Sequence, residues 1–196
     1  MKLKRLLAYV IDILLVGFIA SAISSIEAIN PFYDNYIEAY EKYSKELDNL
    51  NEDNVFDKIK SEEFVLDYQN VLKYGVYSSV ISITCYILYF GGFQKWNKNQ
   101  TVGKKLMRLK VVNKNNKDDV RMWQYILRTI IVYNLLFNSL NVVVSYVFKN
   151  DLFFTISIIT SIIGYVITYV GYIMILFRKD GCGLHDLVSG TKVVEV

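Results

Sequence analysis

The sequence predicts an all-α membrane protein, a bundle of four transmembrane helices in one domain that covers residues 1–196. Of its residues, 53% are apolar and the mean hydropathy is +0.26, and the apolar residues occur in long blocks. A helix needs roughly 20 consecutive apolar residues to cross a hydrocarbon core of about 30 Å, because each residue adds about 1.5 Å. The expected spans cover residues 6–26, 74–93, 125–148 and 152–177.

The charges of the connecting segments orient these four spans. Residues 27–72 contain twelve acidic and four basic residues, whereas residues 94–124 contain nine basic and two acidic residues. Because basic segments stay on the cytoplasmic side, we expect an acidic outer loop, a basic inner loop and cytoplasmic termini, including the inner tail 178–196. The abundance of Lys, Asn, Ile and Tyr is typical of an AT-rich bacterial genome, so the expected location is a bacterial cytoplasmic membrane that the chain crosses several times.

The first span has a competing interpretation as a cleavable signal peptide. It has a basic start, an apolar run and the small residues Ala20-Ser21-Ala22, as such peptides do. However, the apolar run continues to Ile26, and Asp12 is out of place in a signal core. We therefore expect the first span to be retained.

The outer loop 27–72 has a helical periodicity of its own. Apolar residues recur at spacings of four, three, four and three at Tyr36, Tyr40, Tyr43, Leu47 and Leu50. Residues 49–54 indicate a turn, and Val55, Ile59 and Leu66 indicate a second helix that continues toward the next span. The loop is therefore expected to form a helical extracytoplasmic hairpin, although binding of cations by its carboxylates is an alternative.

The inner loop 94–124 and the inner tail each contain one short segment of strand character. Leu109 to Val112 and Thr191 to Val196 are rich in β-branched residues. We expect the two segments to pair as a small cytoplasmic sheet. The basic residues of the inner loop are expected to contact anionic lipid headgroups, each contributing about 1 kcal/mol near the surface.

Asp12 is the most informative single residue, because a carboxylate in the middle of a transmembrane helix costs several kcal/mol on insertion scales. Arg128 begins the third span at a similar cytoplasmic depth. We therefore expect an Asp12–Arg128 ion pair across two helices. The pair either locks the bundle or places Asp12 in a proton or cation path.

The third span also carries a polar stripe. Asn134, Asn138, Asn141 and Ser145 follow one another at spacings of four, three and four. Such side chains avoid lipid, so they either hydrogen-bond to neighbouring helices or line a wet path.

The sequence offers no support for catalysis, a metal site or a cofactor, and we expect the protein not to be an enzyme. His185 is the only histidine and no set of four ligands surrounds it in sequence, so a structural His185-Asp186 turn is expected. Gly103-Lys104 lacks the other residues of a phosphate loop, with Lys98 and Lys105 at the positions concerned. Nucleic-acid binding is not expected in this membrane setting.

Three patches of the chain together resemble the RDD family of membrane proteins. The first is Arg5-Leu6-Leu7-Ala8-Tyr9-Val10-Ile11-Asp12, the second is Thr101-Val102-Gly103-Lys104-Lys105-Leu106 with Leu109 to Val112 and then Arg128, and the third is Leu184-His185-Asp186-Leu187-Val188-Ser189-Gly190-Thr191. The chain departs from the family in its long outer loop and at Met107-Arg108, where the family often has a Gly that favours a tight turn. The resemblance implies that Arg5, Asp12 and Asp186 are signature residues, and it implies a transport role, including cation/proton antiport.

Two functions remain open. The first is a transport component for a small cation or solute, with Asp12 as the group that titrates if transport is coupled to protons. The residues expected along its path are Arg5, Asp12, Arg128, Asn134, Asn138, Asn141 and Asp186. The alternative is a non-catalytic membrane scaffold or accessory module that binds a protein partner. A transporter of four short helices is expected to form a homo-oligomer.

Overall fold

The computed structural model describes residues 1–51, 55–115 and 120–196. The chain forms two compact units. The first unit contains residues 1–21, 82–136 and 164–196, and the second contains residues 22–81 and 137–163.

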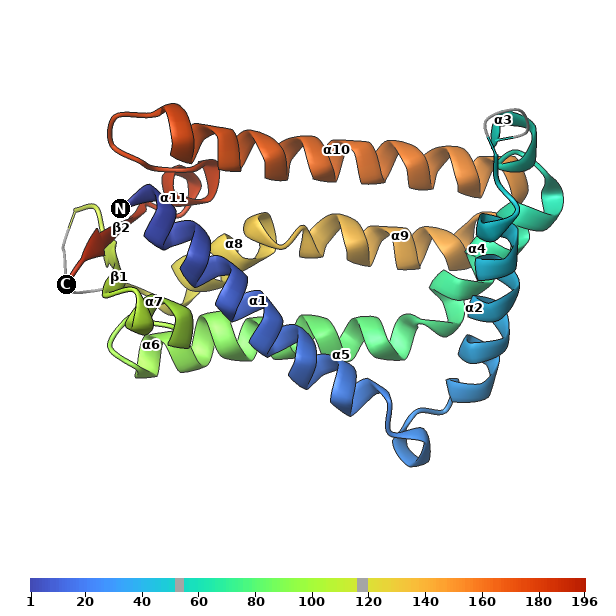
Figure 1. The fold of residues 1–196 in the computed structure, drawn as a ribbon, viewed down its shortest axis with the longest axis horizontal. Coiled ribbons are helices and arrows are strands. Elements are labelled where there is room, and N and C mark those ends of the chain that lie inside the picture. Colours follow the sequence, from blue (N-terminus) through green and yellow to red (C-terminus); the bar gives the residue numbers. More distant parts are fainter. Residues whose placement is uncertain (52–54, 116–119) are drawn as a thin grey trace. The chain divides into compact units, whose positions relative to one another are not determined.

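In the part of the chain that the structure describes, three helical stretches are long and apolar enough to cross a membrane. They are α1 (Lys2–Ser24), the continuous stretch Val76–Trp96 and α10 (Asn150–Phe177), which confirms three of the four expected spans (Figure 1). The middle stretch consists of α5 (Val76–Ile87), the π-helical η2 (Leu88–Phe93) and α6 (Gln94–Trp96). A fourth span exists only if the bent pair α8 (Met122–Val132) and α9 (Leu135–Val147) crosses as one.

The break between α8 and α9 falls at Tyr133 and Asn134. The Tyr133 N–H still bonds to the Thr129 carbonyl at 3.1 Å, but Asn134 has a φ of 56°, in the left-handed region that ends a helix. Asn adopts this region more readily than other residues with side chains. A Cβ on Gly164 of α10 would lie 2.4 Å from Asn134 Oδ1, so the Asn134 side chain occupies the space that Gly164 leaves opposite the break.

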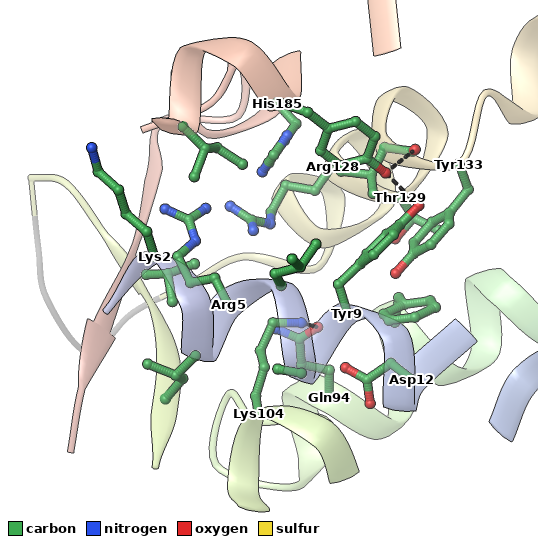
Figure 2. Close-up of a pocket in the computed structure, with 18 of the residues that line it drawn as sticks. Lys2, Arg5, Tyr9, Asp12, Gln94, Lys104, Arg128, Thr129, Tyr133 and His185 are labelled. Carbon is green, nitrogen blue, oxygen red and sulfur yellow. Dashed lines mark hydrogen bonds between the residues drawn. The ribbon is translucent and has the colours of Figure 1, made fainter. Parts of the chain in front are cut away.

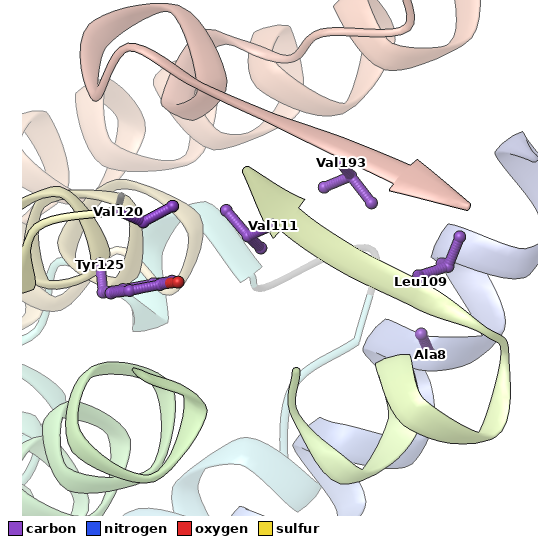
Figure 3. Packing of buried hydrophobic residues seen from close by; sticks show 6 residues of the cluster. All are labelled: Ala8, Leu109, Val111, Val120, Tyr125 and Val193. Carbon is purple, nitrogen blue, oxygen red and sulfur yellow. The ribbon is translucent and has the colours of Figure 1, made fainter. Parts of the chain in front are cut away.

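The first unit contains the expected two-stranded sheet. Strand β1 (Leu109–Asn113) pairs antiparallel with β2 (Thr191–Glu195), which confirms the predicted partners. The inner face of the sheet packs in a cluster of buried apolar residues that joins it to α1 and α8 (Figure 3). The cluster consists of Ala8, Leu109, Val111, Val120, Tyr125 and Val193.

A short helix, α7 (Val102–Leu106), precedes β1. Thr101 caps it, because its hydroxyl accepts from the Lys104 N–H at 3.2 Å. Arg108 then turns the chain into β1 with a φ of 56°. The tight turn therefore forms without the glycine that the family resemblance associates with it, at the cost of a left-handed residue that has a side chain.

After α10 the chain folds back so that Gly183 packs against α10, and it then continues into α11 (Leu184–Val188) and β2. A Cβ on Gly183 would lie 2.8 Å from the carbonyl oxygen of Gly171 in α10. This close backbone approach requires Gly at position 183, and it places Asp186 of α11 inside the first unit.

The second unit contains the expected helical hairpin, built from α2 (Tyr33–Asp48) and α4 (Glu62–Tyr74). Tyr43 of α2 packs on Phe64 and Tyr68 of α4, with ring centroids 5.3 and 5.7 Å apart. Two shorter helices flank the pair, η1 (Glu27–Ile29) and α3 (Val55–Lys58). Part of the expected turn at 49–54 lies outside the described residues, and the hairpin's extracytoplasmic position stays a prediction.

The hairpin is fixed to the rest of the second unit by a buried amide. Gln69 Nε2 of α4 donates to the carbonyl oxygens of Ser145 and Phe148 at 2.6 and 2.7 Å, which satisfies carbonyl groups near the end of α9. Val65, Val144 and Phe153 form the buried apolar cluster beside it. The second outer helix does not run unbroken into the next span, because Gly75 separates α4 from α5.

Candidate functional site

Asp12 of α1 is buried, and neutral donors satisfy its carboxylate. The Thr101 hydroxyl donates to Oδ2 at 2.5 Å, and the Gly103 N–H and the Tyr89 hydroxyl donate to Oδ1 at 2.8 and 2.7 Å. These three bonds offset the desolvation of the ionised group. They also fix the first turn of α7 against α1.

The contact between α7 and α1 leaves no space for a side chain at Gly103. A Cβ there would lie 2.3 Å from the Ala8 carbonyl oxygen and 2.9 Å from Asp12 Oδ1. The Thr-Val-Gly sequence at 101–103 therefore has a physical role, since Thr101 supplies a hydroxyl and Gly103 permits the close approach that its N–H needs.

Asp186 of α11 is the second buried carboxylate, and two arginines hold it. Arg5 Nη2 donates to Oδ2 at 2.8 Å, Arg128 Nη1 pairs with Oδ1, and the Gly183 N–H donates to Oδ2 at 3.0 Å. Burial acts to raise the pKa of Asp186, but the charges of Arg128 and Arg5 outweigh it and hold the pKa well below its usual range. Asp186 is therefore ionised at neutral pH.

The predicted Asp12–Arg128 pair is wrong. Within residues 1–51, 55–115 and 120–196 no ion pair joins the two side chains, because Arg128 bonds to Asp186 and, at 2.5 Å, to the Thr191 hydroxyl. Asp12 obtains neutral donors from the inner loop instead. The sequence does not distinguish Asp12 from Asp186 as the partner of Arg128, because the fold brings both carboxylates into the first unit.

His185 is buried next to these groups and is neutral. Its Nε2 lies 3.5 Å from Asp186 Oδ2, and burial, together with the neighbouring Arg128, lowers the pKa of His185 to about 3. Its backbone carbonyl accepts from the Ser189 hydroxyl at 2.6 Å, so the expected structural turn forms. The described residues contain no group of three or more His, Cys, Asp or Glu side chains that could hold a metal ion.

A cavity of about 390 Å³ lies in the first unit between these two carboxylate clusters. Its walls come from α1, η2, α6, α7, α8, the end of α10, α11 and the sheet. Figure 2 shows the side chains of Arg5, Arg128 and His185 gathered in one part of the cavity and the rings of Tyr9 and Tyr133 in another. The volume falls in the range of small-molecule sites, roughly 300–1,000 Å³.

The charged groups that line the cavity are mostly cationic. Among the described residues of the lining they are Lys2, Arg5, Lys104, Arg128 and one carboxylate, Asp12. Asp186 lies behind the wall and neutralises part of the charge of the two arginines. The cavity therefore carries an excess of positive charge.

Lys104 is the charged group of the cavity with the weakest partners. Its Nζ lies 3.4 Å from Gln94 Oε1 and from Thr101 Oγ1, and 5.5 Å from the centroid of the Phe90 ring. Burial lowers the pKa of Lys104 to about 8. Asp12 of α1 and Asp186 of α11 oppose this shift, whereas Arg128 of α8 and Arg5 of α1 add to it.

Sequence reasoning missed Lys104 as a site residue. It treated the basic inner loop as one surface that faces lipid headgroups. The available signal was its place in the Thr-Val-Gly-Lys patch, next to the residues that bind Asp12.

The predicted asparagine stripe does not form one face. Asn134 is buried at the break, and Asn141 is buried with Nδ2 donating to Ser161 Oγ at 2.9 Å, but Asn138 is exposed. The left-handed turn at Asn134 interrupts the helical period that would have aligned it with the other two. Arg5, Asp12, Arg128 and Asp186 thus lie together in the first unit, whereas Asn138 and Asn141 belong to the second.

Comparison with known proteins identifies one family. The model of the RDD family matches residues 2–190, nearly the whole chain. Neither the curated proteins nor the solved structures contain a match to this sequence.

Proposed function

Because the chain belongs to the RDD family and carries apolar helices that suit a lipid bilayer, we propose that it is a multi-pass membrane transport component whose cavity binds a small solute. The observation that carries the proposal is the cavity of about 390 Å³, lined by ionised side chains of α1, α7 and α8. Charged groups are rare within membrane-spanning segments unless they are paired or line a solute path.

The charges of the cavity favour an anionic solute over a cation. Both oxygens of Asp12 already accept hydrogen bonds, so a cation would have to displace donors from the one carboxylate that the described residues contribute to the lining. An anion would instead meet the ammonium of Lys104 and the guanidinium of Arg128. Protons could still be coupled to transport through protonation of Asp12, which would weaken its hold on α7.

The proposed setting is the cytoplasmic membrane of a bacterium, with the cavity at the cytoplasmic side. The residues that surround the cavity come from the basic inner loop and from both termini, and basic segments remain in the cytoplasm. The acidic hairpin of α2 and α4 would then be outside. We further propose that the protein is not an enzyme.

Transport is tested with the full chain in proteoliposomes that enclose a pH-sensitive dye. Uptake of labelled sodium, rubidium and phosphate is measured together with internal pH, for the wild type and for Asp12→Asn at equal abundance. Glu38→Gln is the matched control, since Glu38 is an exposed carboxylate of the second unit. We expect uptake of phosphate in the wild type and in Glu38→Gln, and its loss in Asp12→Asn. Absence of any flux, or undiminished flux in Asp12→Asn, would refute the proposal.

A membrane accessory module is the second candidate, and the saturated hydrogen bonding of Asp12 and Asp186 favours it. Both carboxylates hold short segments in place, which is what a structural signature would do. Under this alternative Asp12→Asn lowers the amount of protein in the membrane, and a protein partner copurifies in mild detergent. Normal abundance of Asp12→Asn, with no copurifying partner, would count against it.

A further inference from the structure

We propose that the cavity of the first unit binds the phosphate headgroup of an anionic membrane lipid, with the start of the hydrocarbon chain leaving between exposed leucines at its mouth. This inference rests on the proposed function for the membrane setting and names the ligand class of the same site. Three independent features of the cavity support the proposal. They are cationic side chains with unused N–H donors, a buried hydroxyl without a hydrogen-bond partner among the described residues, and an apolar mouth.

The first feature is a pair of cationic side chains, Lys104 and Arg128, whose N–H donors are not all used in strong hydrogen bonds. Among the described residues, the ammonium of Lys104 makes two long contacts to neutral oxygens, both at 3.4 Å, and lies 5.5 Å from the centroid of the Phe90 ring. Both hydrogen bonds that Arg128 makes to the described residues leave through Nη1, although a guanidinium carries five N–H donors on three nitrogens. Lysine and arginine are the usual phosphate-binding side chains, and arginine fits two phosphate oxygens at once.

The second feature is the hydroxyl of Tyr125. Tyr125 lines the cavity with 1% of its surface exposed, and its hydroxyl has no hydrogen-bond partner among the described residues. A buried hydroxyl without a partner costs about 1–3 kcal/mol. A ligand oxygen in the cavity would supply the missing partner, and Tyr125 comes from the same turn of α8 as Arg128.

The third feature is the mouth of the cavity. Leu3, Leu6 and Leu176 belong to its lining, yet they are 68%, 57% and 58% exposed. Lys2 Nζ donates to the Leu176 carbonyl, which keeps the start of α1 beside the end of α10. An exposed apolar rim around a cationic interior suits an amphiphile, whose chain stays in lipid while its headgroup enters.

The cavity is too small for a whole phospholipid, and its apolar mouth favours the headgroup of an amphiphile over a free ion as the tightly bound ligand. At about 390 Å³ it holds a headgroup and the first atoms of a chain. The rings of Tyr9, Phe90 and Tyr133 line its apolar part. A free inorganic anion would leave these rings and the leucines without a partner, so the lipid is the better occupant.

Binding is measured by native mass spectrometry of the full chain in detergent. The probes are phosphatidic acid, phosphatidylcholine and inorganic phosphate, added separately and in competition. We expect one tightly held phosphatidic acid per chain, roughly 10-fold weaker retention of phosphatidylcholine and no competition from equimolar phosphate. Equal retention of the two lipids, or displacement of the lipid by equimolar inorganic phosphate, would overturn the proposal.

Two variants locate the bound lipid. Lys104→Met should weaken binding of phosphatidic acid roughly 10-fold, whereas Lys105→Met, which removes an exposed charge from the same helix, should leave it unchanged. Tyr125→Phe should weaken binding about fivefold and leave the lipid-free protein as stable as the wild type or more stable, because it removes only the unpaired hydroxyl. Equal effects of Lys104→Met and Lys105→Met, or unchanged binding in Tyr125→Phe, would place the lipid elsewhere.

The outcome separates the inference from the proposed function. Lipid binding without any flux in proteoliposomes would leave this inference standing and remove transport. Flux of phosphate without specific lipid binding would support transport and remove this inference.

Discussion

Replacing Gly103 by Ala should separate α7 from α1. The added Cβ would lie 2.3 Å from the Ala8 carbonyl oxygen and 2.9 Å from Asp12 Oδ1, and the first of these atoms belongs to the backbone and cannot swing aside. Overpacking of this kind costs about 1–3 kcal/mol. Moving α7 outward also lengthens the 2.8 Å bond from the Gly103 N–H to Asp12, a bond to a charged group that contributes about 1.5–3 kcal/mol.

The overpacking and the weakened hydrogen bond together should lower the free energy of unfolding by about 3–5 kcal/mol. For a chain of this size this loss corresponds to a fall in Tm of roughly 6–20 °C. The assay is thermal unfolding in detergent, followed with a thiol-reactive fluorogenic dye. Cys182 is a suitable reporter, because it is a free cysteine with 1% of its surface exposed.

Gly17→Ala is the matched control. It makes the same change in α1, where no atom lies within 4 Å of the added Cβ, so it should leave stability unchanged or raise it by up to about 1 kcal/mol. If Gly103→Ala and Gly17→Ala unfolded at the same temperature, the contact between α7 and α1 described above would be incorrect, and with it the account of how Asp12 is satisfied.

Three further results are expected. Asp186→Asn should destabilise the protein by about 3–5 kcal/mol in the same unfolding assay, because Arg5 and Arg128 lose their buried partner, and a change below about 1 kcal/mol would contradict the pairing. Arg108→Gly should stabilise the protein by about 1 kcal/mol, since Gly adopts the φ of 56° without strain, and a lower Tm would show that the arginine side chain matters more than the turn. Binding of phosphatidic acid to the wild type should weaken as the pH rises above about 8, where Lys104 loses its proton. The variant Lys104→Arg should bind this lipid equally well at pH 7 and 9.5. If the wild type also bound it equally well at both pH values, the charge of Lys104 would have no part in the site.

Much of the fold could be predicted from the sequence, because apolar runs and β-branched segments act locally. Three apolar helices, the strand character of β1 and of β2 and the two helices of the hairpin each follow from residues close together in the chain. The break at Asn134 could not be predicted from hydropathy, since the apolar residues continue on both sides of it. It depends on a left-handed asparagine and on the space that Gly164 leaves in α10.

The sequence predicted four charged residues that the structure brings into one unit, but it did not predict how they pair. The sequence indicated that Arg5, Asp12, Arg128 and Asp186 matter, and the structure brings all four into the first unit. Which arginine meets which carboxylate depends on how the inner loop and the tail fold back, and these segments are separated by tens of residues. Tyr125 and Lys104 were missed for the same reason, because an unpaired hydroxyl or a weakly paired ammonium becomes visible only when its neighbours are known.

The two buried carboxylates explain how a cationic cavity can exist in an apolar protein. Asp186 neutralises part of the charge of Arg5 and Arg128, which makes the burial of two guanidinium groups tolerable. Asp12 instead accepts hydrogen bonds from Thr101 and Gly103 at the start of α7, and these bonds fix the helix that carries Lys104. A transport defect in Asp12→Asn could therefore have either of two physical causes, which are loss of a titrating group and displacement of Lys104. Lys104→Met separates them, because it leaves Asp12 with all three of its donors, and equal defects in the two variants would assign Asp12 the role of positioning Lys104.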